Sequence, residues 1–135
     1  MFGALDISTS ALAAQRTRLD AISNNLANQH SVYDKDGNYE PFRRRIPVFA
    51  PGDPATGSDM GVHVREILED DAPLRKVHVG VGHPLADAEG FMKMPNVDPT
   101  VEMVNAIEAS RAYEANITAA ETTKSMMNAA LRLIA

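Results

Sequence analysis

A calcium-binding loop begins with alternating oxygen-bearing side chains, and one segment of the chain has them: Asp34-Lys35-Asp36-Gly37-Asn38. Such a loop needs glycine at its sixth position for a tight turn and a carboxylate at its twelfth to close the site. Counted from Asp34, these positions hold Tyr39 and Arg45. Because both requirements fail, and because Asp-Gly and Gly-Asn are common turn dipeptides, the segment predicts a turn between strands.

The histidines are the next candidates for metal binding or acid–base catalysis. No two of them have the spacing of a zinc-binding helix, and no serine or carboxylate motif accompanies them; they are His30, His63, His78 and His83. The chain has no cysteine, which excludes disulfides, thiol catalysis and cysteine-based zinc sites. It also has no P-loop or other glycine-rich phosphate cradle. The sequence therefore predicts that the chain has no catalytic, metal or cofactor site and that it is not an enzyme.

One basic run, Arg43-Arg44-Arg45, stands beside Phe42 and could suggest nucleic acid or acidic lipid. The chain as a whole is acidic, with a net charge of −5 and a pI near 5.3, and it lacks the basic footprint of a nucleic-acid binder. The run also lies in a strand-like stretch. We therefore expect either a solvated strand face or an ion-paired surface against another subunit, and no nucleic-acid partner.

No segment approaches the ~18 consecutive apolar residues of a membrane span, so we expect no direct membrane insertion. The first six residues contain no basic n-region of a cleavable signal peptide, and the first positive charge is Arg16. These features alone predict a cytoplasmic protein, or one exported by a route that needs no cleaved signal.

Helix breakers divide the chain of 135 residues into three zones. Residues 30–96 contain all of the prolines but Pro99 and all of the glycines but Gly3. We therefore expect an N-terminal helix within 1–29, a β-rich segment and linker over 30–95, and a C-terminal helix within 96–135. Phe42–Phe49 and the alternating valines at 62 and 64 and at 77, 79 and 81 predict short strands of a small, irregular antiparallel β unit.

Apolar residues in the N-terminal zone recur every seven positions, which keeps them on one face of a helix of ~26 residues. The opposite face carries Arg16, Arg18, Asp20 and Asn24. The expected seam consists of Leu5, Leu12, Leu19 and Leu26, with Ile22 on a neighbouring row.

The C-terminal zone predicts a helix of about 36 residues and ~54 Å. Asp98 is a suitable N-cap, and Pro99 follows at the first helical position, where its missing N–H costs nothing. Such a helix is longer than the ~30 Å width of a single globule of this size, so it needs a partner along its length. The expected seam alternates by three and four residues: Met103, Ala106, Ser110, Tyr113, Ile117, Ala120, Lys124, Met127, Leu131 and Ile134.

Three separate motifs in the chain resemble motifs of one protein family. Ser23-Asn24-Asn25-Leu26-Ala27-Asn28 is similar to the Asn-Asn-Leu-Ala-Asn signature of flagellar rod and hook proteins, the axial family. Met103-Val104-Asn105 and the segment 109–116 resemble the C-terminal motif of that family, and Lys124, Met126 and Leu131 fit its tail. The segment 83–97 resembles the linker of the proximal-rod members, and the short length fits them too.

The resemblance implies a fold in which the two terminal helices pair as an antiparallel coiled coil and stack with those of neighbours into a tube. The protein would be a structural subunit of the basal-body rod, which transmits torque and encloses the export channel. Its implied partners are copies of itself, other rod proteins, the membrane ring at the rod base and the type III export apparatus. Its implied location is the periplasmic rod, reached without signal cleavage. A soluble coiled-coil adaptor or scaffold is the alternative.

Three asparagines of the signature are the final candidates: Asn24, Asn25 and Asn28. Asparagine is a poor residue for a helix interior, but it adopts the left-handed conformation readily and bonds to free backbone groups. These asparagines would then form a C-terminal cap. Alternatively, one or more of the amides lies in the subunit interface and fixes the register, as buried asparagine does in coiled coils.

Overall fold

Two long helices lie at the ends of the sequence, and the β-strands lie between them in chain order. The computed structural model describes residues 2–135, and it is mainly α with a small β portion, as predicted. Its elements in chain order are α1 (Phe2–Ala27), β1 (Arg45–Asp53), β2 (Ser58–Glu69), β3 (Arg75–His78), β4 (Phe91–Met94) and α2 (Pro99–Ile134).

The start of α2 confirms the predicted cap. The Asp98 carboxylate accepts hydrogen bonds from the backbone N–H groups of Thr100 and Val101, at 2.9 and 3.4 Å, and Pro99 begins the helix. From there α2 runs for 36 residues without a glycine or an internal proline. At 1.5 Å per residue its length is about 54 Å.

The end of α1 is capped, but not by a left-handed residue. The Asn28 side-chain amide donates to the backbone carbonyl and to the side-chain oxygen of Asn24, at 2.9 and 2.7 Å. Among the described residues, only glycines have a positive φ. Asn28 therefore caps the helix end through its side chain and not through a left-handed backbone conformation.

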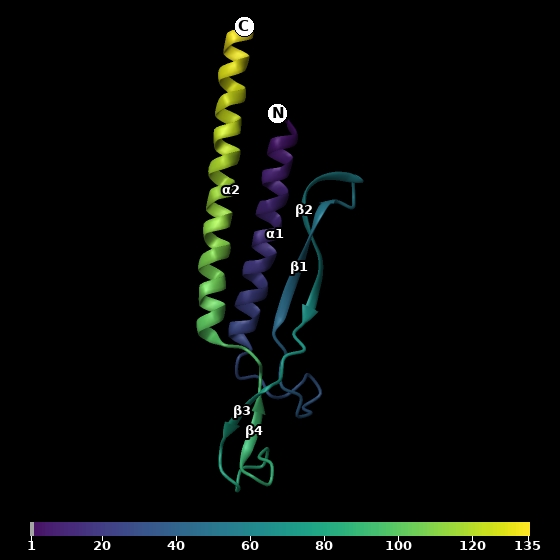
Figure 1. Cartoon of the computed structure of the whole chain (residues 1–135), viewed down its shortest axis with the longest axis vertical. Coiled ribbons are helices and arrows are strands. Elements are labelled where there is room, and N and C mark those ends of the chain that lie inside the picture. The colour runs from purple at the N-terminus through teal and green to yellow at the C-terminus, as the bar shows by residue number, and fades with distance from the viewer. Residues whose placement is uncertain (1) are drawn as a thin grey trace.

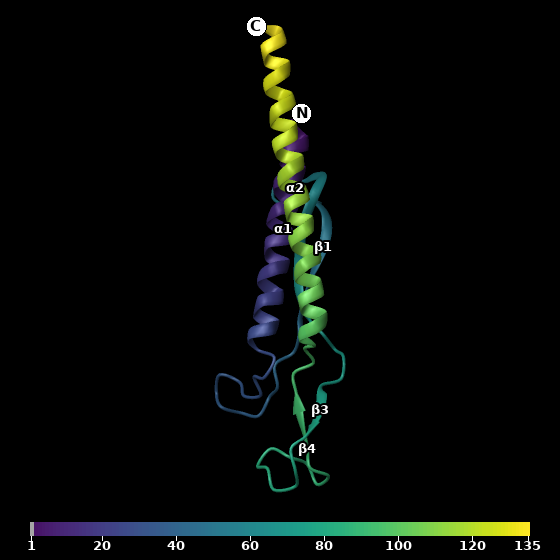
Figure 2. The same cartoon turned by 90° about the vertical axis from the view of Figure 1, so that its left-hand side faces the viewer.

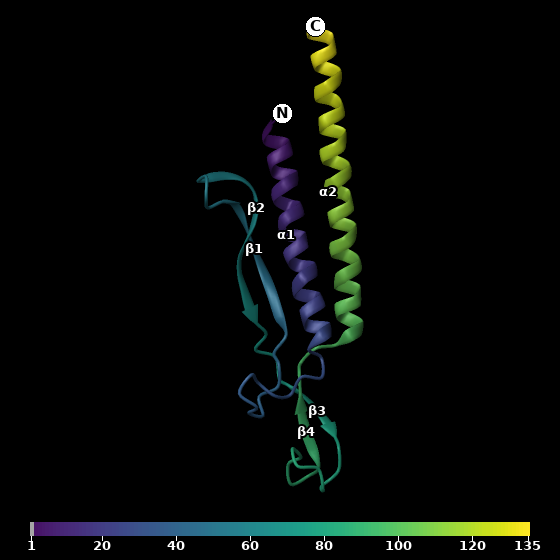
Figure 3. The same cartoon turned by 180° about the vertical axis from the view of Figure 1, so that it is seen from behind.

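The helices lie side by side and antiparallel, with α1 between α2 and the β1–β2 hairpin (Figure 1). Views turned by 90° and 180° show the same order and an elongated molecule (Figures 2 and 3). We call the end where α1 stops and α2 starts the base. At the opposite end α2, which is ten residues longer than α1, extends past the N-terminus of α1.

The β portion consists of two separate hairpins, where the sequence predicted one unit. In the first, β1 pairs with β2 from Arg45 opposite Glu69 to Asp53 opposite Ser58, with two irregularities in register. In the second, β3 pairs with β4 from Arg75 opposite Met94 to His78 opposite Phe91. This second hairpin lies beyond the base, away from the helices (Figure 1).

The first hairpin contacts α1 closely at a glycine. Gly61 has a φ of +91°, and a Cβ atom there would lie 2.7 Å from the Ser10 hydroxyl oxygen. The same hydroxyl accepts a hydrogen bond of 3.1 Å from the Val62 backbone N–H. Glycine is therefore required by both the backbone conformation and the short distance to α1.

Buried side chains are few, and most lie near the base. The fully buried larger ones are Asn25, Pro95, Val97 and Glu102, two of which are polar. Small side chains make up most of the remaining apolar core, which consists of Ala14, Ala21, Ile22 and Ala109. The free energy of folding therefore comes mainly from the basal third of the helix pair.

We predict that local stability decreases along the helix pair from the base toward the free end of α2, and that this decrease is measurable in the isolated chain. Amide hydrogen exchange should be slowest around residues 21–25 and 97–109, where side chains are buried. It should be fast from residue 113 onward, because local opening there exposes little apolar surface. Uniform strong protection along the whole of α1 and α2 would contradict this expectation.

Candidate assembly interface

The carboxamide of Asn25 attaches α1 to the edge of the first hairpin. Its oxygen accepts from the Arg45 backbone N–H at 2.8 Å, and its Nδ2 donates to the Arg45 carbonyl at 2.9 Å. One side chain thus makes the two hydrogen bonds that a neighbouring strand would make. Asn25 is only 1% exposed, so these bonds replace water that the Arg45 backbone would otherwise need.

The carboxylate of Glu102 attaches α2 to the same point. It has no exposed surface, and buried carboxylates need charge pairing and hydrogen bonds. Arg44 supplies the charge, with Nε 2.6 Å from Oε1, and Asn25 donates to Oε2 at 3.1 Å. The first turn of α2, the last turn of α1 and the start of β1 therefore meet in one cluster.

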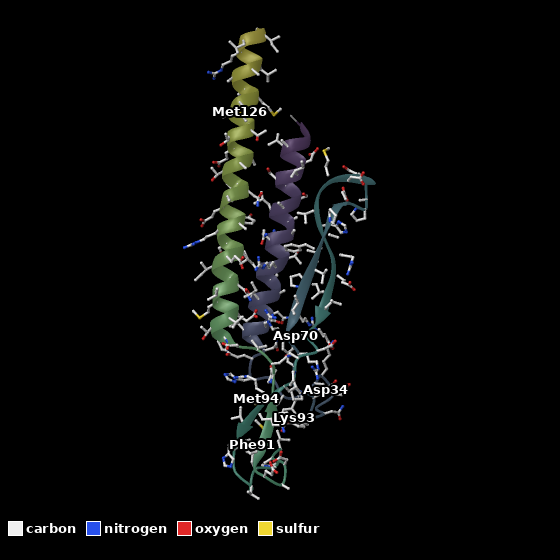
Figure 4. The ribbon with its side chains drawn as sticks, viewed as in Figure 1. Asp34, Asp70, Phe91, Lys93, Met94 and Met126 are labelled. Carbon is white, nitrogen blue, oxygen red and sulfur yellow. The ribbon has the colours of Figure 1, made fainter. Side chains whose placement is uncertain are left out.

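Two further residues connect this cluster to the end of β2 and to the linker before α2. Asp70 lies 3.5 Å from Arg44 Nη1 (Figure 4), and Asn96 accepts from the Arg44 backbone N–H at 2.8 Å. The Asn96 amide also donates to the carbonyls of Asp70 and Ala72. We call these residues the basal polar cluster: Asn25, Arg44, Asp70, Asn96 and Glu102.

The cluster corrects the expectation for Arg43 and Arg44, whereas the side chain of Arg45 is exposed, as on a solvated strand face. Arg44 is neither on a solvated face nor reserved for another subunit, because its ion pairs lie within its own chain. Burial alone lowers the Arg44 pKa, but the hydrogen bond and charge of Glu102, followed by those of Asp70, raise it above its ordinary value. Arg43 also bonds within the chain, to the carbonyls of Asp70 and Ala72.

Above the base, the buried side chains of the helices are small, and Ala14 lines a hollow together with His63 and Val64 of β2. Ala14 and Ala21 on α1, seven residues apart, are buried, as is Ala109 on α2. Arg18 on α1 forms an ion pair of 2.9 Å with Glu108 on α2, whose side chain is 66% exposed. An exposed pair of this kind contributes little to stability.

The structure distributes the predicted seam residues over three environments. Asn25 and Ile22 are buried. Partly covered positions are Leu5, Leu12, Leu19, Asn24, Leu26 and Asn28 on or just after α1, and Ala106, Tyr113, Ile117, Ala120 and Met127 on α2. Exposed positions are Met103, Ser110, Lys124, Leu131 and Ile134.

Two sets of large apolar side chains on α2 are more than half exposed among the described residues. Met103, Val104 and Ile107 are all more than half exposed on the basal part of α2, and we call them the outer patch. Leu131, Leu133 and Ile134 lie on the part of α2 that extends past α1, and we call them the terminal patch. Leu133 and Ile134 are 89% and 84% exposed, so the terminal patch is available to a neighbouring chain.

The predicted turn at Asp34 is confirmed. Its carboxylate accepts hydrogen bonds from the side-chain amide of Asn38 and then from the backbone N–H groups of Asn38 and Asp36, which hold the Asp34 pKa below its ordinary value. Within residues 2–135, no group of three or more histidines and carboxylates is placed to hold a metal ion. No described helix is long and apolar enough to cross a membrane.

The sequence reasoning missed Glu102 and Arg44 as a pair. Glu102 lies in the first turn of a helix, where an acidic residue is already favoured by the helix dipole. Its presence there therefore did not indicate a buried ion pair. A carboxylate among apolar residues, directly between Val101 and Met103, was the available clue to burial.

Comparisons with known proteins agree with this arrangement at both ends of the chain. Residues 5–29 match the family model described as "Flagella basal body rod protein". Residues 88–133 match the one described as "Flagellar basal body rod FlgEFG protein C-terminal". The first segment contains most of α1 with Asn25, and the second contains most of α2 with Asn96 and Glu102.

Full-length relatives decide the family. The flagellar basal-body rod protein FlgC of Salmonella typhimurium is 50% identical over 132 residues, covering 95% of this chain and 93% of the relative. FlgC of Bacillus subtilis is 39% identical over 146 residues, covering 98% and 97%. The chain belongs to the FlgC family of flagellar basal-body rod proteins. FlgC of Aquifex aeolicus is 43% identical over 125 residues, covering 92% and 90%.

Membership in the FlgC family makes the chain a structural subunit of the flagellar basal-body rod. The family is known for structural rod proteins and not for enzymes. In this setting the exposed apolar patches on α2 are candidate contacts with other rod components.

We predict that Asn25→Ala destabilises the chain more than Asn28→Gly. Without the Asn25 amide, the Arg45 backbone groups and the Glu102 carboxylate lose hydrogen-bond partners where water cannot replace them. This loss should lower the free energy of unfolding by roughly 1–3 kcal/mol. Asn28 bonds only to neighbours within a few residues, and glycine also ends helices well, so its loss costs less than about 1 kcal/mol. Urea unfolding followed by circular dichroism measures both; equal effects would refute the distinction.

We also predict a large difference between the two glutamates that bond to arginine. Glu102→Ala leaves Arg44 partly buried without its main partner and should cost about 3–5 kcal/mol. Glu108→Ala removes an exposed pair and should cost at most about 1 kcal/mol. The same unfolding experiment gives both values, and a Glu102→Ala effect no greater than that of Glu108→Ala would show that the cluster does not stabilise the base.

Proposed function

We propose that this rod subunit polymerises through its terminal helices, which pair as an antiparallel coiled coil and stack with those of neighbours into the wall of a tube. In this assembly 1–29 and 96–135 form the tube, and 30–95 forms an outer segment. The tube transmits torque as a drive shaft and encloses the channel through which later subunits are exported.

The observation that carries this proposal is the terminal patch. The part of α2 that extends past α1 ends in Leu131, Leu133 and Ile134, all of which are more than 60% exposed among the described residues. Each such side chain contributes about 1.5–3 kcal/mol when it is fully buried. Neighbouring subunits that cover the terminal patch would therefore stabilise the assembly strongly.

The hairpin arrangement supports the outward position of the β segment. The β1–β2 hairpin packs on the side of α1 that faces away from α2, so the far side of α2 carries no β structure (Figure 3). The outer patch on α2 is consequently free to pack against helices of adjacent subunits. A contact between unlike surfaces that does not close on itself produces an open helical polymer.

The proposed partners are copies of this chain, other flagellar rod proteins, the membrane ring at the rod base and the flagellar type III export apparatus. The proposed location is the rod in the periplasmic space, reached by export without signal cleavage. Helices with few buried side chains suit this route, because little free energy is needed to unfold them for passage through a narrow channel. Membership in the rod family favours this function over that of a soluble coiled-coil adaptor.

We predict that Leu131→Asp and Ile117→Asp abolish rod assembly and motility. A carboxylate buried in a packed helix interface without a partner is strongly unfavourable. Leu131 is exposed in the single chain, whereas Ile117 is already partly covered, so Leu131→Asp is the cleaner test of the contact between subunits. Ser125→Asp, at an exposed polar position of the same helix, is the matched control and should assemble normally.

Rods counted by electron microscopy and swimming in soft agar measure the effect, and secreted subunit in the medium separates failed assembly from failed export. Normal rods in the Leu131→Asp strain would exclude the terminal patch from the assembly contact.

A further inference from the structure

One side of α1 stays exposed, although α2 and the first hairpin cover other sides of this helix. Exposed residues recur along it at intervals of four and three, which places them on one face of the helix. Most of them have small side chains, and the two charged ones, Arg16 and Asp20, have opposite sign. Neither forms an ion pair within the described residues. We call these residues the open face of α1: Thr9, Ala13, Arg16, Asp20, Ser23 and Ala27.

The exposed side of α2 has the complementary character. It begins at the base with the outer patch, in which Met103 and Ile107 are 61% and 56% exposed. Arg111 and Glu114 follow at helical spacing, both exposed, and neither forms an ion pair within residues 2–135. Among the described helices and strands, only α1 contacts α2 closely (Figure 1). We call Met103, Ile107, Arg111 and Glu114 the outer face of α2.

The charges of the two faces match in one antiparallel register. Where two helices run antiparallel, residue numbers rise along one helix as they fall along the other. Arg16 opposite Glu114 therefore places Asp20 opposite Arg111, and both contacts join opposite charges. Charge complementarity of this kind selects one register and one partner more than it adds affinity.

The apolar side chains match in the same register. It sets Ser23 opposite Ile107 and Ala27 opposite Met103, so each large apolar side chain of α2 meets a small residue of α1. Small residues at a contact allow two helices to approach closely. Burial of Ile107 and Met103 then supplies affinity that exposed charges alone do not provide.

We propose that the open face of α1 in one copy packs against the outer face of α2 in an adjacent copy. Two copies of the same orientation can form this contact, because α1 and α2 run antiparallel within each chain (Figure 1). The pairing rests on the proposed tube and names two surfaces through which its neighbouring subunits meet. Because these surfaces are unlike, the contact repeats from copy to copy without closing into a two-fold dimer.

The register also displaces adjacent copies along the long axis. Within one chain Arg18 pairs with Glu108, so Arg16 lies at about the level of residue 110. Side-by-side copies without displacement would bring Arg16 of one copy near Arg111 of the next, where like charges repel. A position opposite Glu114 requires a shift of about four residues, or ~6 Å at 1.5 Å per residue. Because every copy is shifted in the same sense, the copies follow a helix and not a flat ring.

Paired cysteine variants test the contact, because the chain has no cysteine of its own. Cells co-express Ser23→Cys and Ile107→Cys as separate chains with different tags, and isolated basal bodies are treated with a mild oxidant. A disulfide forms only where the two Cα atoms come within about 7 Å of each other. Ala27→Cys with Met103→Cys is the second pair. Ser23→Cys with Ser125→Cys is the matched control, since Ser125 is exposed on α2 but lies about 27 Å along the helix from Ile107.

We expect mixed disulfide dimers from both test pairs at a level at least fivefold above that of the control pair. Basal bodies with intact rods but no such excess would overturn the contact between these faces and leave the helix-built tube standing. Dimers of the Ile107→Cys chain with itself, in place of mixed dimers, would indicate a two-fold contact between outer faces and would also overturn it.

Charge reversal tests the register without cysteine. Arg16→Glu and Glu114→Arg each place like charges together and should each reduce the number of rods several-fold, with the amount of secreted subunit unchanged. Both changes in one chain should restore the rods. Arg16→Glu with Glu121→Arg, a reversal seven residues farther along α2, is the matched control and should not restore them. No loss in the single variants, or no recovery in the Arg16→Glu, Glu114→Arg double variant, would overturn the proposed register.

Discussion

The buried contact of Glu102 with Arg44 and Asn25 determines how every other part of the molecule is placed. It joins the last turn of α1, the first turn of α2 and the beginning of β1 at one point. Asp70 and Asn96 extend it to the end of β2 and to the linker. With so few large apolar side chains in the core, relative orientation at the base depends on directional polar bonds. Such bonds specify one geometry, whereas apolar packing alone tolerates several.

Features encoded by neighbouring residues could be predicted from the sequence. The Asp98-Pro99 cap fixed the start of α2 because it requires only the first turn of the helix. The turn at Asp34 followed from its local dipeptides, and the seven-residue spacing of leucines gave α1. Each of these signals involves residues within one or two helical turns of each other.

The contacts that build the base could not be predicted in this way. Asn25 and Glu102 are 77 residues apart, and Arg44 and Glu102 are 58 apart. The chain has 18 acidic residues, so nothing local distinguishes the one that pairs with Arg44. The division of the β portion into two hairpins was also missed, because strands of four residues leave almost no periodic pattern. Asn25 itself was selected by the family signature, but its bond to β1 required knowledge of the fold.

The unequal lengths of α1 and α2 give the subunit a direction. One end of the molecule is formed by the β3–β4 hairpin beyond the base, whereas the other end is the single helix α2. Because the two ends of the subunit differ in shape, a stack of identical copies in one orientation differs from a stack in the opposite orientation. An assembly built from them has distinguishable ends, and subunits arriving at the growing end meet a different surface from those already fixed at the starting end. The polarity of such an assembly would thus already be present in the outline of the monomer.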